Sequence, residues 1–259
     1  MERTGSLERA RGRSYNAVCN DLMATVAGGR TPVSEPDSIE EMNRYYQARA
    51  PWHDEYMGYT SNADLEALLT PIVRDVEGNV ADRALLEIAC GTGNWTQVLA
   101  RRTRSVLATD ASVAMIEIAR AKEYPEGRVA FAVADAYTLD GVAEGRFSAA
   151  FAADWWSHIP NCRLGAFLRT LHGKLQEGSR VVFLDMLQRH DPDFEHYRVD
   201  GEGNRIHRRR LPDGREFDVI KNFPTERQLR ATVAGVATEV EVREYPELAR
   251  WMLSYTVVG

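Results

Sequence analysis

The chain has 259 residues, of which 44% are hydrophobic, 27% charged and 9% aromatic, as is ordinary for globular proteins. This composition excludes disordered, collagen-like and low-complexity chains, and no apolar stretch is long enough to cross a membrane. The net charge of −6 disfavours nucleic acid as a partner, because phosphate backbones are bound by basic surfaces. The three cysteines form no CxxC pair, and the N-terminus lacks a secretory signal. We therefore expect a cytoplasmic protein without a zinc site.

Proline and capping patterns organise the first part of the chain. We expect an N-terminal extension over residues 1–37, with a short helix and a Pro-containing linker. A helical segment over 38–79 follows, and its first helix is predicted to begin with a capping box at Ser38. Pro51 should limit that helix, and the next helix should continue or kink through Pro71.

Residues 80–259 alternate short apolar runs with stretches of helical periodicity. The apolar runs are 84–89, 105–109, 128–134, 147–153 and 180–187, and helices are expected near 95–102, 113–122 and 163–175. Repeated strand–helix–strand order predicts a doubly wound α/β fold, with a mostly parallel sheet covered by helices on both faces. Gly178 is predicted to end the last of these helices.

The pattern changes after Asp185. Two strand-like runs flank the turn residues 212–214, which predicts a β-hairpin insertion around 198–222, after the fifth strand. Thr225 is the expected N-cap of a further helix. Two more strand candidates close the chain and bring the predicted sheet to seven strands.

The most informative segment runs from a buried strand into a glycine turn and a helix. Two glycines, Gly91 and Gly93, allow the backbone to approach a ligand closely, and the helix N-terminus adds hydrogen-bond donors. A dinucleotide fingerprint would require a third glycine where Thr96 stands. Glu87, on the strand, suits a cationic cofactor better than a diphosphate.

Two further carboxylates end the next two strands. Asp110 ends the second strand, and Asp135 ends the third. Because the carboxyl ends of parallel strands share one edge of the sheet, both should lie where open α/β sheets bind ligands.

With Glu87 and the glycine turn, these acids make the chain resemble the class I S-adenosylmethionine-dependent methyltransferases over roughly residues 40–259. The resemblance implies that Asp110 bonds the ribose hydroxyls, that Asp135 bonds the adenine amine, and that Glu87 supports the methionine end. The cofactor-binding residues it implies are Tyr46, Trp52, Glu87, Ala89, Cys90, Gly91, Gly93, Asp110, Ala111, Met115, Asp135, Ala136 and Ala153.

The helical segment looks like the lid of small-molecule members of this family. Its aromatic side chains can exclude water and favour a sulfonium, although they can equally serve to pack the helix on the sheet. The expected substrate-binding residues are Tyr45, Arg49, Tyr56, Trp155, Trp156, Arg208 and Arg210. Arg208 and Arg210 share one face of a predicted strand and suit an acceptor carboxylate or phosphate; the alternatives are a solvated strand or a homodimer contact.

His158 and Asp154 follow the fourth strand and are the candidate catalytic residues, since each can take a proton. A dedicated base is not required, because aligning the two reactants alone contributes about 7–11 kcal/mol. The other histidines have no metal-ligand spacing, so no metal is expected.

The sequence therefore predicts transfer of a methyl group from S-adenosylmethionine to a small-molecule O-, N- or C-nucleophile, with release of S-adenosylhomocysteine. Two alternatives stay open on the same fold. One is an enzyme that uses the sulfonium only electrostatically, as a decarboxylase or pericyclase would. The other is a catalytically silent binding subunit, against which the intact acids and glycines argue.

Overall fold

The computed structural model describes residues 35–58, 61–188 and 197–258, and its main sheet has seven strands in the order β3-β2-β1-β4-β5-β10-β9. The parallel strands are β1 (Ala84–Ile88), β2 (Ser105–Asp110), β3 (Val129–Val133), β4 (Phe147–Ala153) and β5 (Leu175–Met186). β10 (Arg250–Val257) runs antiparallel between β5 and β9 (Ala237–Tyr245). The predicted doubly wound, mostly parallel sheet is confirmed.

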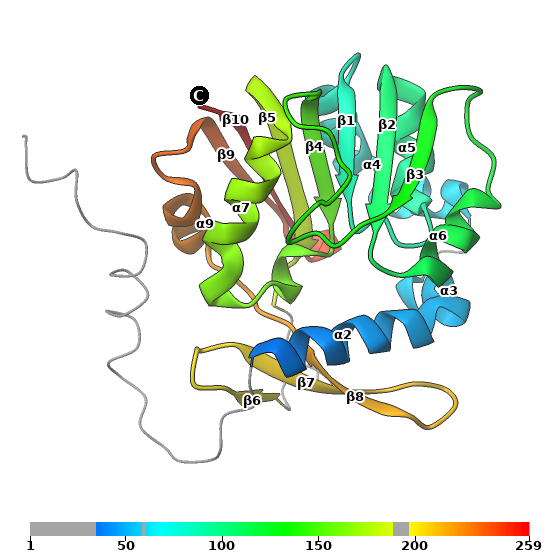
Figure 1. The fold of residues 1–259 in the computed structure, drawn as a ribbon, viewed down its shortest axis with the longest axis vertical. Helices are drawn as coiled ribbons and strands as arrows, with labels where there is room; N and C mark the ends of the chain where they lie inside the picture. Colours follow the sequence, from blue (N-terminus) through cyan, green and yellow to red (C-terminus); the bar gives the residue numbers. More distant parts are fainter. Residues whose placement is uncertain (1–34, 59–60, 189–196, 259) are drawn as a thin grey trace, which may run out of the picture.

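Helices cover both faces of this sheet (Figure 1). One face holds α4 (Asn62–Val80), α5 (Asn94–Arg102) and α6 (Val113–Arg120), and the other holds α7 (Leu164–Gly173) and α9 (Glu226–Val233). Side chains alternate along a strand, so Leu85 of β1 packs with the first set of helices and Leu86 with the second. No helix in the described ranges is both long and apolar enough to cross a membrane.

The first described helix, α2 (Glu35–Arg49), begins before Ser38, so the predicted capping box at Ser38 is wrong. Pro36 lies in the first turn of this helix, where the missing N–H of proline costs no intrahelical bond. The helix ends where Pro51 predicts, because Ala50–Trp52 forms a 3-10 turn, η2. Of the predicted extension, residues 1–34 lie outside the described part of the chain.

Of the two outcomes expected at Pro71, a continued helix or a kinked one, the structure shows the kink. The role predicted for Gly178 is wrong. Leu69 leaves helical geometry, with φ −117°, two residues before Pro71 of α4. Helix α7 ends at Gly173, and Gly178 lies inside β5 with φ 73°. The β4–β5 register shifts after Phe147, so this glycine provides a positive φ in an irregular strand and not a helix end.

The predicted hairpin is confirmed as β7 (Arg205–Arg210) and β8 (Glu216–Ile220), and β6 (Tyr197–Val199) adds a third strand. Helix α2 lies between this small sheet and the main sheet (Figure 1). An apolar cluster joins α2 to the hairpin and consists of Met42, Tyr45, Leu211 and Val219. The hairpin and α2 together therefore cover the edge of the sheet where the predicted site lies.

Candidate active site

A cavity of about 870 Å³ lies at the carboxyl ends of the parallel strands. Strand β1 pairs with β2 on one side and with β4 on the other, so the strand order reverses there and leaves a crevice. Helix α2, the short helix α3 (His53–Met57) and the hairpin supply the opposite wall. The volume falls within the range of about 300–1,000 Å³ that is typical of small-molecule sites.

The turn between β1 and α5 forms one wall of the cavity. Ala89, Gly91 and Gly93 all have positive φ, at 52°, 55° and 81°. The Gly91 N–H donates to Oδ2 of Asp110 over 2.9 Å, which fixes the turn against β2. A Cβ at residue 93 would lie 2.5 Å from the Tyr124 hydroxyl, so glycine is required there for packing.

Glu87 lies behind this turn and is only 1% exposed. Its Oε2 accepts a 2.7 Å hydrogen bond from the Thr96 hydroxyl. Burial, with Asp110 nearby, raises the pKa of Glu87 to about 8 although the Thr96 bond lowers it. This carboxyl group is therefore largely protonated at neutral pH, and a cation bound beside it would favour its ionised form.

Asp110 and Asp135 both lie at the cavity, as predicted. The second oxygen of Asp110 accepts from the Ser112 N–H over 2.8 Å, and burial raises the pKa of Asp110. Asp135 Oδ1 accepts from the Tyr137 N–H, also over 2.8 Å. The predicted cofactor residues that line the cavity are Tyr46, Glu87, Ala89, Cys90, Gly91, Asp110, Ala111, Met115, Asp135, Ala136 and Ala153.

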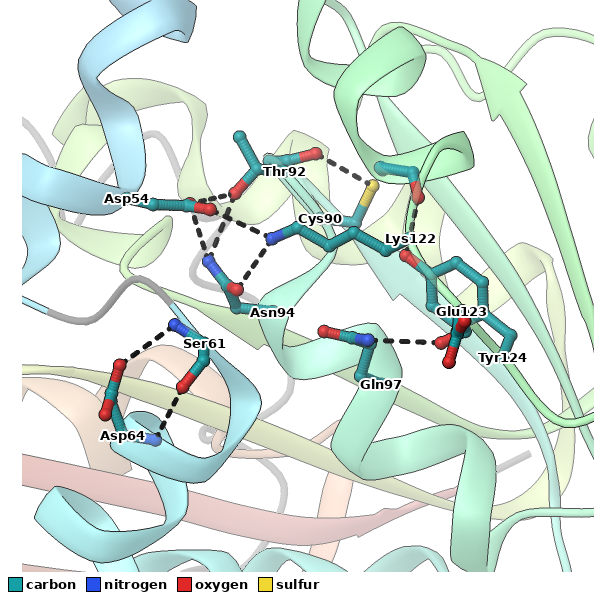
Figure 2. Close-up of polar contacts among 12 residues, drawn as sticks. Asp54, Ser61, Asp64, Cys90, Thr92, Asn94, Gln97, Lys122, Glu123 and Tyr124 are labelled. Carbon is teal, nitrogen blue, oxygen red and sulfur yellow. Dashed lines mark hydrogen bonds and ion pairs between the residues drawn. The ribbon is translucent and has the colours of Figure 1, made fainter.

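Asp54 on α3 connects the covering helices to the glycine turn, a contact that the sequence did not predict (Figure 2). It accepts from the Thr92 hydroxyl, from the Asn94 amide over 2.7 Å and from Nζ of Lys122 over 3.0 Å. Lys122 also donates to Oδ1 of Asn94 over 2.7 Å. Burial alone would raise the pKa of Asp54, but the bonds from Thr92 and Lys122 hold it below its ordinary value.

Arg49 and His53 lie on the same side of the cavity as the turn. Arg49 is 4% exposed, and its Nε and Nη2 have no hydrogen-bond partner. A Cβ at residue 91 would lie 3.3 Å from Nε2 of His53, whose buried Nδ1 is also without a partner. Burial, and then the charge of Arg49, lower the pKa of His53 to about 3. Buried polar groups without partners suit a ligand that brings hydrogen-bond acceptors.

His158, a predicted base, has both ring nitrogens occupied. Nε2 lies 2.7 Å from the Tyr46 hydroxyl, and Nδ1 lies 2.5 Å from the carbonyl oxygen of Ile220. Burial, and then the charge of Lys221, lower the pKa of His158 to about 3, so the ring is neutral. A carbonyl oxygen only accepts, so Nδ1 carries the proton and the Tyr46 hydroxyl donates to Nε2.

Asp154, the other predicted base, follows β4 and lines the cavity. Its φ is 52°, a conformation that costs energy for a residue other than glycine and that concentrates at functional sites. Oδ2 lies 3.9 Å from Nη2 of Arg250, whereas Oδ1 is buried without a partner. Of the two predicted bases, Asp154 is thus the one with an unengaged proton-accepting atom.

The hairpin brings cationic side chains to the cavity. Arg209 and Arg215 line it, and Nη1 of Arg209 donates to the Tyr56 hydroxyl over 2.9 Å. Lys221, 4% exposed, donates to the Ser157 hydroxyl over 2.7 Å and forms a 3.1 Å ion pair with Asp185. Burial would raise the pKa of Asp185, but Lys221 holds it below its ordinary value.

Some predicted site residues lie elsewhere. Of the expected substrate-binding residues, those that line the cavity are Tyr45, Arg49, Tyr56 and Trp155, and those that do not are Trp156, Arg208 and Arg210. Two expected cofactor-binding residues, Trp52 and Gly93, also lie outside the lining. Trp156 is 2% exposed and packs in the core against Phe183. Arg208 is paired with Asp218 over 3.0 Å on the outer face of the hairpin, so the cavity receives Arg209 instead.

Comparisons with known proteins show which proteins this chain resembles. A family model described as a methyltransferase domain matches residues 85–178. The structure of a DhpI–SAH complex has a TM-score of 0.69 and 26% identity, over 87% of this chain and 99% of that chain. A DhpI–SAM–HEP complex has a TM-score of 0.68 and 27% identity, over 86% and 99%.

A more distant likeness shows the fold alone. The 1,6-didemethyltoxoflavin-N1-methyltransferase of Burkholderia thailandensis, with bound 1,6-didemethyltoxoflavin and S-adenosylhomocysteine, has a TM-score of 0.59 and 17% identity. The match covers 90% of this chain and 95% of that chain. The search of curated proteins finds no match.

Proposed function

We propose that this protein, which belongs to the class I S-adenosylmethionine-dependent methyltransferases, transfers a methyl group from S-adenosylmethionine to a small molecule in the cavity and releases S-adenosylhomocysteine. The observation that carries the proposal is the glycine turn with Glu87, Asp110 and Asp135 along one wall of a cavity whose other walls are aromatic and cationic. When bound, S-adenosylmethionine supplies a methyl group on a sulfonium, which is electrophilic without further activation.

The residues at the turn fit this cofactor. Asp110 would hold the ribose hydroxyls and Asp135 the adenine amine, and Glu87 would face the cationic methionine end. The unpartnered nitrogens of Arg49 and His53 would hold the carboxylate of that end. Arg49, expected from the sequence to bind the acceptor, is thus assigned to the cofactor, because its neighbour His53 lies against the glycine turn.

The walls formed by α2, α3 and the residues after β4 would exclude water from the reacting atoms. Tyr46, Tyr56 and Trp155 line the cavity, and aromatic faces attract a sulfonium through their π-electrons. Of the predicted lid segment 38–79, we assign the part formed by α2 and α3 as the lid that closes over cofactor and acceptor, with Asp54 as its contact to the glycine turn. The remainder, α4, packs against a face of the main sheet and contributes no residue to the cavity.

Positioning supplies the larger share of the rate enhancement in this proposal. Aligning two reactants contributes about 7–11 kcal/mol, whereas proton removal contributes roughly 10²–10⁴-fold in rate. Asp154, with its unengaged Oδ1, is the candidate base for an acceptor that carries a proton. His158 would contribute by positioning the Tyr46 hydroxyl, since both of its own ring nitrogens are engaged in hydrogen bonds.

Calorimetric titration tests the cofactor site. We expect S-adenosylmethionine and S-adenosylhomocysteine to bind with dissociation constants of roughly micromolar size, and we expect NAD not to bind. Asp110→Ala should weaken binding about tenfold or more, because a buried hydroxyl pair on the ligand loses its acceptor. The exposed Asp140→Ala is the matched control. Unchanged affinity in Asp110→Ala would refute the assigned ribose contact.

Release of S-adenosylhomocysteine in the presence of an acceptor tests the reaction itself. Mass spectrometry of a mixture of small molecules incubated with protein and S-adenosylmethionine should show a product heavier by one methyl substitution. Binding of cofactor with a chemical change in the acceptor but no S-adenosylhomocysteine would instead indicate an enzyme that uses the sulfonium only electrostatically.

A further inference from the structure

Gln47 on α2 is a polar residue of the cavity wall to which the proposed reaction assigns no role. Its side chain is exposed and lines the cavity. Oε1 of Gln47 accepts a 2.7 Å hydrogen bond from the hydroxyl of Ser112, the N-cap residue of α6. Ser112 lies two residues after Asp110, so this bond brings Gln47 to the part of the wall that is assigned above to the ribose.

Ser112 determines which end of the Gln47 amide remains for a ligand. The Ser112 hydroxyl accepts from the N–H of Met115 over 3.2 Å and gives its one proton to Oε1 of Gln47. Because the amide carries its oxygen and its nitrogen on the same planar carbon, Nε2 keeps two N–H groups that point away from this bond. No described residue accepts a hydrogen bond from Nε2 of Gln47. The cavity wall therefore holds an unengaged donor beside Asp110.

Asp110 supplies the complementary acceptors. Its two carboxylate oxygens accept from the N–H groups of Gly91 and Ser112, over 2.9 and 2.8 Å. A carboxylate has about four lone-pair sites, so each oxygen can still accept a proton from a ligand hydroxyl. The two backbone N–H groups and the Ser112 hydroxyl are engaged within the protein, whereas the Gln47 amide is not.

A ribose hydroxyl needs partners of both kinds. When it donates its proton to Asp110, its oxygen keeps two lone pairs. Under the lid those lone pairs lose water, and a polar group that loses water without a new partner weakens binding. The amide of Gln47 offers the donor that such an oxygen requires, and it is carried by the lid helix α2.

We propose that Gln47 is a second ribose-binding residue, whose Nε2 donates to a hydroxyl oxygen of the cofactor ribose while Asp110 accepts the hydroxyl proton. The inference rests on the proposed function and adds a specificity to it. A cofactor without that hydroxyl would leave a carboxylate and an amide unpaired, and sites built to hydrogen-bond a hydroxyl reject ligands that lack it. The contact also makes the closure of α2 depend on the adenosine half of the cofactor.

Calorimetric titration with three ligands tests the inference: S-adenosylhomocysteine, its 2′-deoxy form and its 3′-deoxy form. The unmodified protein should bind at least one deoxy form about tenfold or more weakly than the parent ligand. Gln47→Leu keeps the bulk of the side chain without a donor. It should bind the parent about fivefold or more weakly than the unmodified protein does, and that deoxy form within about twofold. Gln176→Leu, at an exposed glutamine of β5 outside the cavity lining, should change each affinity by less than about twofold.

Each result separates the inference from the proposed function. Failure of the unmodified protein to bind S-adenosylhomocysteine refutes the proposed function. If that ligand binds but Gln47→Leu binds it equally well, or if the unmodified protein does not distinguish the deoxy forms, the inference is overturned and the proposed function stands. A loss in Gln47→Leu that is equal for all three ligands also overturns it, because the bond to Ser112 would then only hold α2 in place. Gln47→Met, likewise without a donor, repeats the comparison should Gln47→Leu fail to fold.

Discussion

The hydroxyl of Tyr46 donates a 2.7 Å hydrogen bond to Nε2 of His158, and this bond joins α2 to the segment that follows β4. His158 in turn donates through Nδ1 to Ile220 of the hairpin. One imidazole therefore connects three walls of the cavity. Its role in the proposed reaction is to position Tyr46, whose oxygen keeps its acceptor capacity for a ligand.

Tyr46→Phe should destabilise the fold. The substitution keeps the aromatic ring but leaves Nε2 of the buried His158 without a donor. We expect the free energy of unfolding to fall by about 1–3 kcal/mol, measured by urea denaturation. Tyr197→Phe, at a half-exposed ring on β6, is the control and should change it by less than about 0.5 kcal/mol. Equal effects would show that the Tyr46–His158 bond contributes nothing.

Asp185→Ala should lower the free energy of unfolding by more than Tyr46→Phe does, because it leaves the buried ammonium group of Lys221 without its carboxylate partner. Asp185 is fully buried and forms a 3.1 Å ion pair with Lys221. Loss of one partner from such a pair typically costs about 3–5 kcal/mol. Glu226→Ala removes one member of an exposed pair with Arg230 and should cost less than about 1 kcal/mol. Urea unfolding of both variants gives the comparison, and similar losses would contradict the argument.

Glu87 makes stability depend on pH. The unfolded chain loses this proton near the ordinary pKa of 4.5, whereas the folded protein keeps it up to about 8. The folded state binds more protons between these values, so the free energy of unfolding should fall as the pH rises from about 5 to about 8. Each unit of pKa shift corresponds to about 1.4 kcal/mol.

Glu87→Gln should flatten this dependence, since the amide does not titrate and still accepts from Thr96. Urea unfolding at about pH 5, 6.5 and 8 measures it, with the exposed Glu126→Gln as control. A slope in Glu87→Gln as steep as in the unmodified protein would exclude Glu87 as its source.

The sequence predicted the elements and acids that local pattern determines. Buried strands appear in the sequence as apolar runs, and Asp110 is the last residue of one of them. Its location at the carboxyl edge of the sheet could therefore be predicted from the order of the strands alone. Asp54 could not be found in this way, because an acid in a helix of five residues has no signal for a partner as distant in sequence as Thr92. Likewise, alternation separated Arg208 from Arg209 but did not indicate which face of the strand meets the cavity.

Asp54→Ala should loosen the covering helices. Asp54 is the common acceptor for Thr92, Asn94 and Lys122, so its removal frees α3 from the glycine turn (Figure 2). We expect faster amide hydrogen exchange in α3 and affinity for S-adenosylhomocysteine reduced about tenfold. Glu55→Ala, at the next position of α3, is the matched control. If both variants exchange and bind alike, the Asp54 contact does not hold the helix.

Arg49→Gln tests the carboxylate end of the cofactor site. The guanidinium is buried, and two of its nitrogens have no partner, so a ligand carboxylate should gain a charge-assisted bond there. Calorimetry should show S-adenosylhomocysteine bound about tenfold or more weakly by this variant, since such bonds contribute about 1.5–3 kcal/mol. Binding of 5′-methylthioadenosine, which lacks the amino-acid part, should change less than about threefold. A similar loss for both ligands would mean that Arg49 shapes the cavity and does not hold the carboxylate.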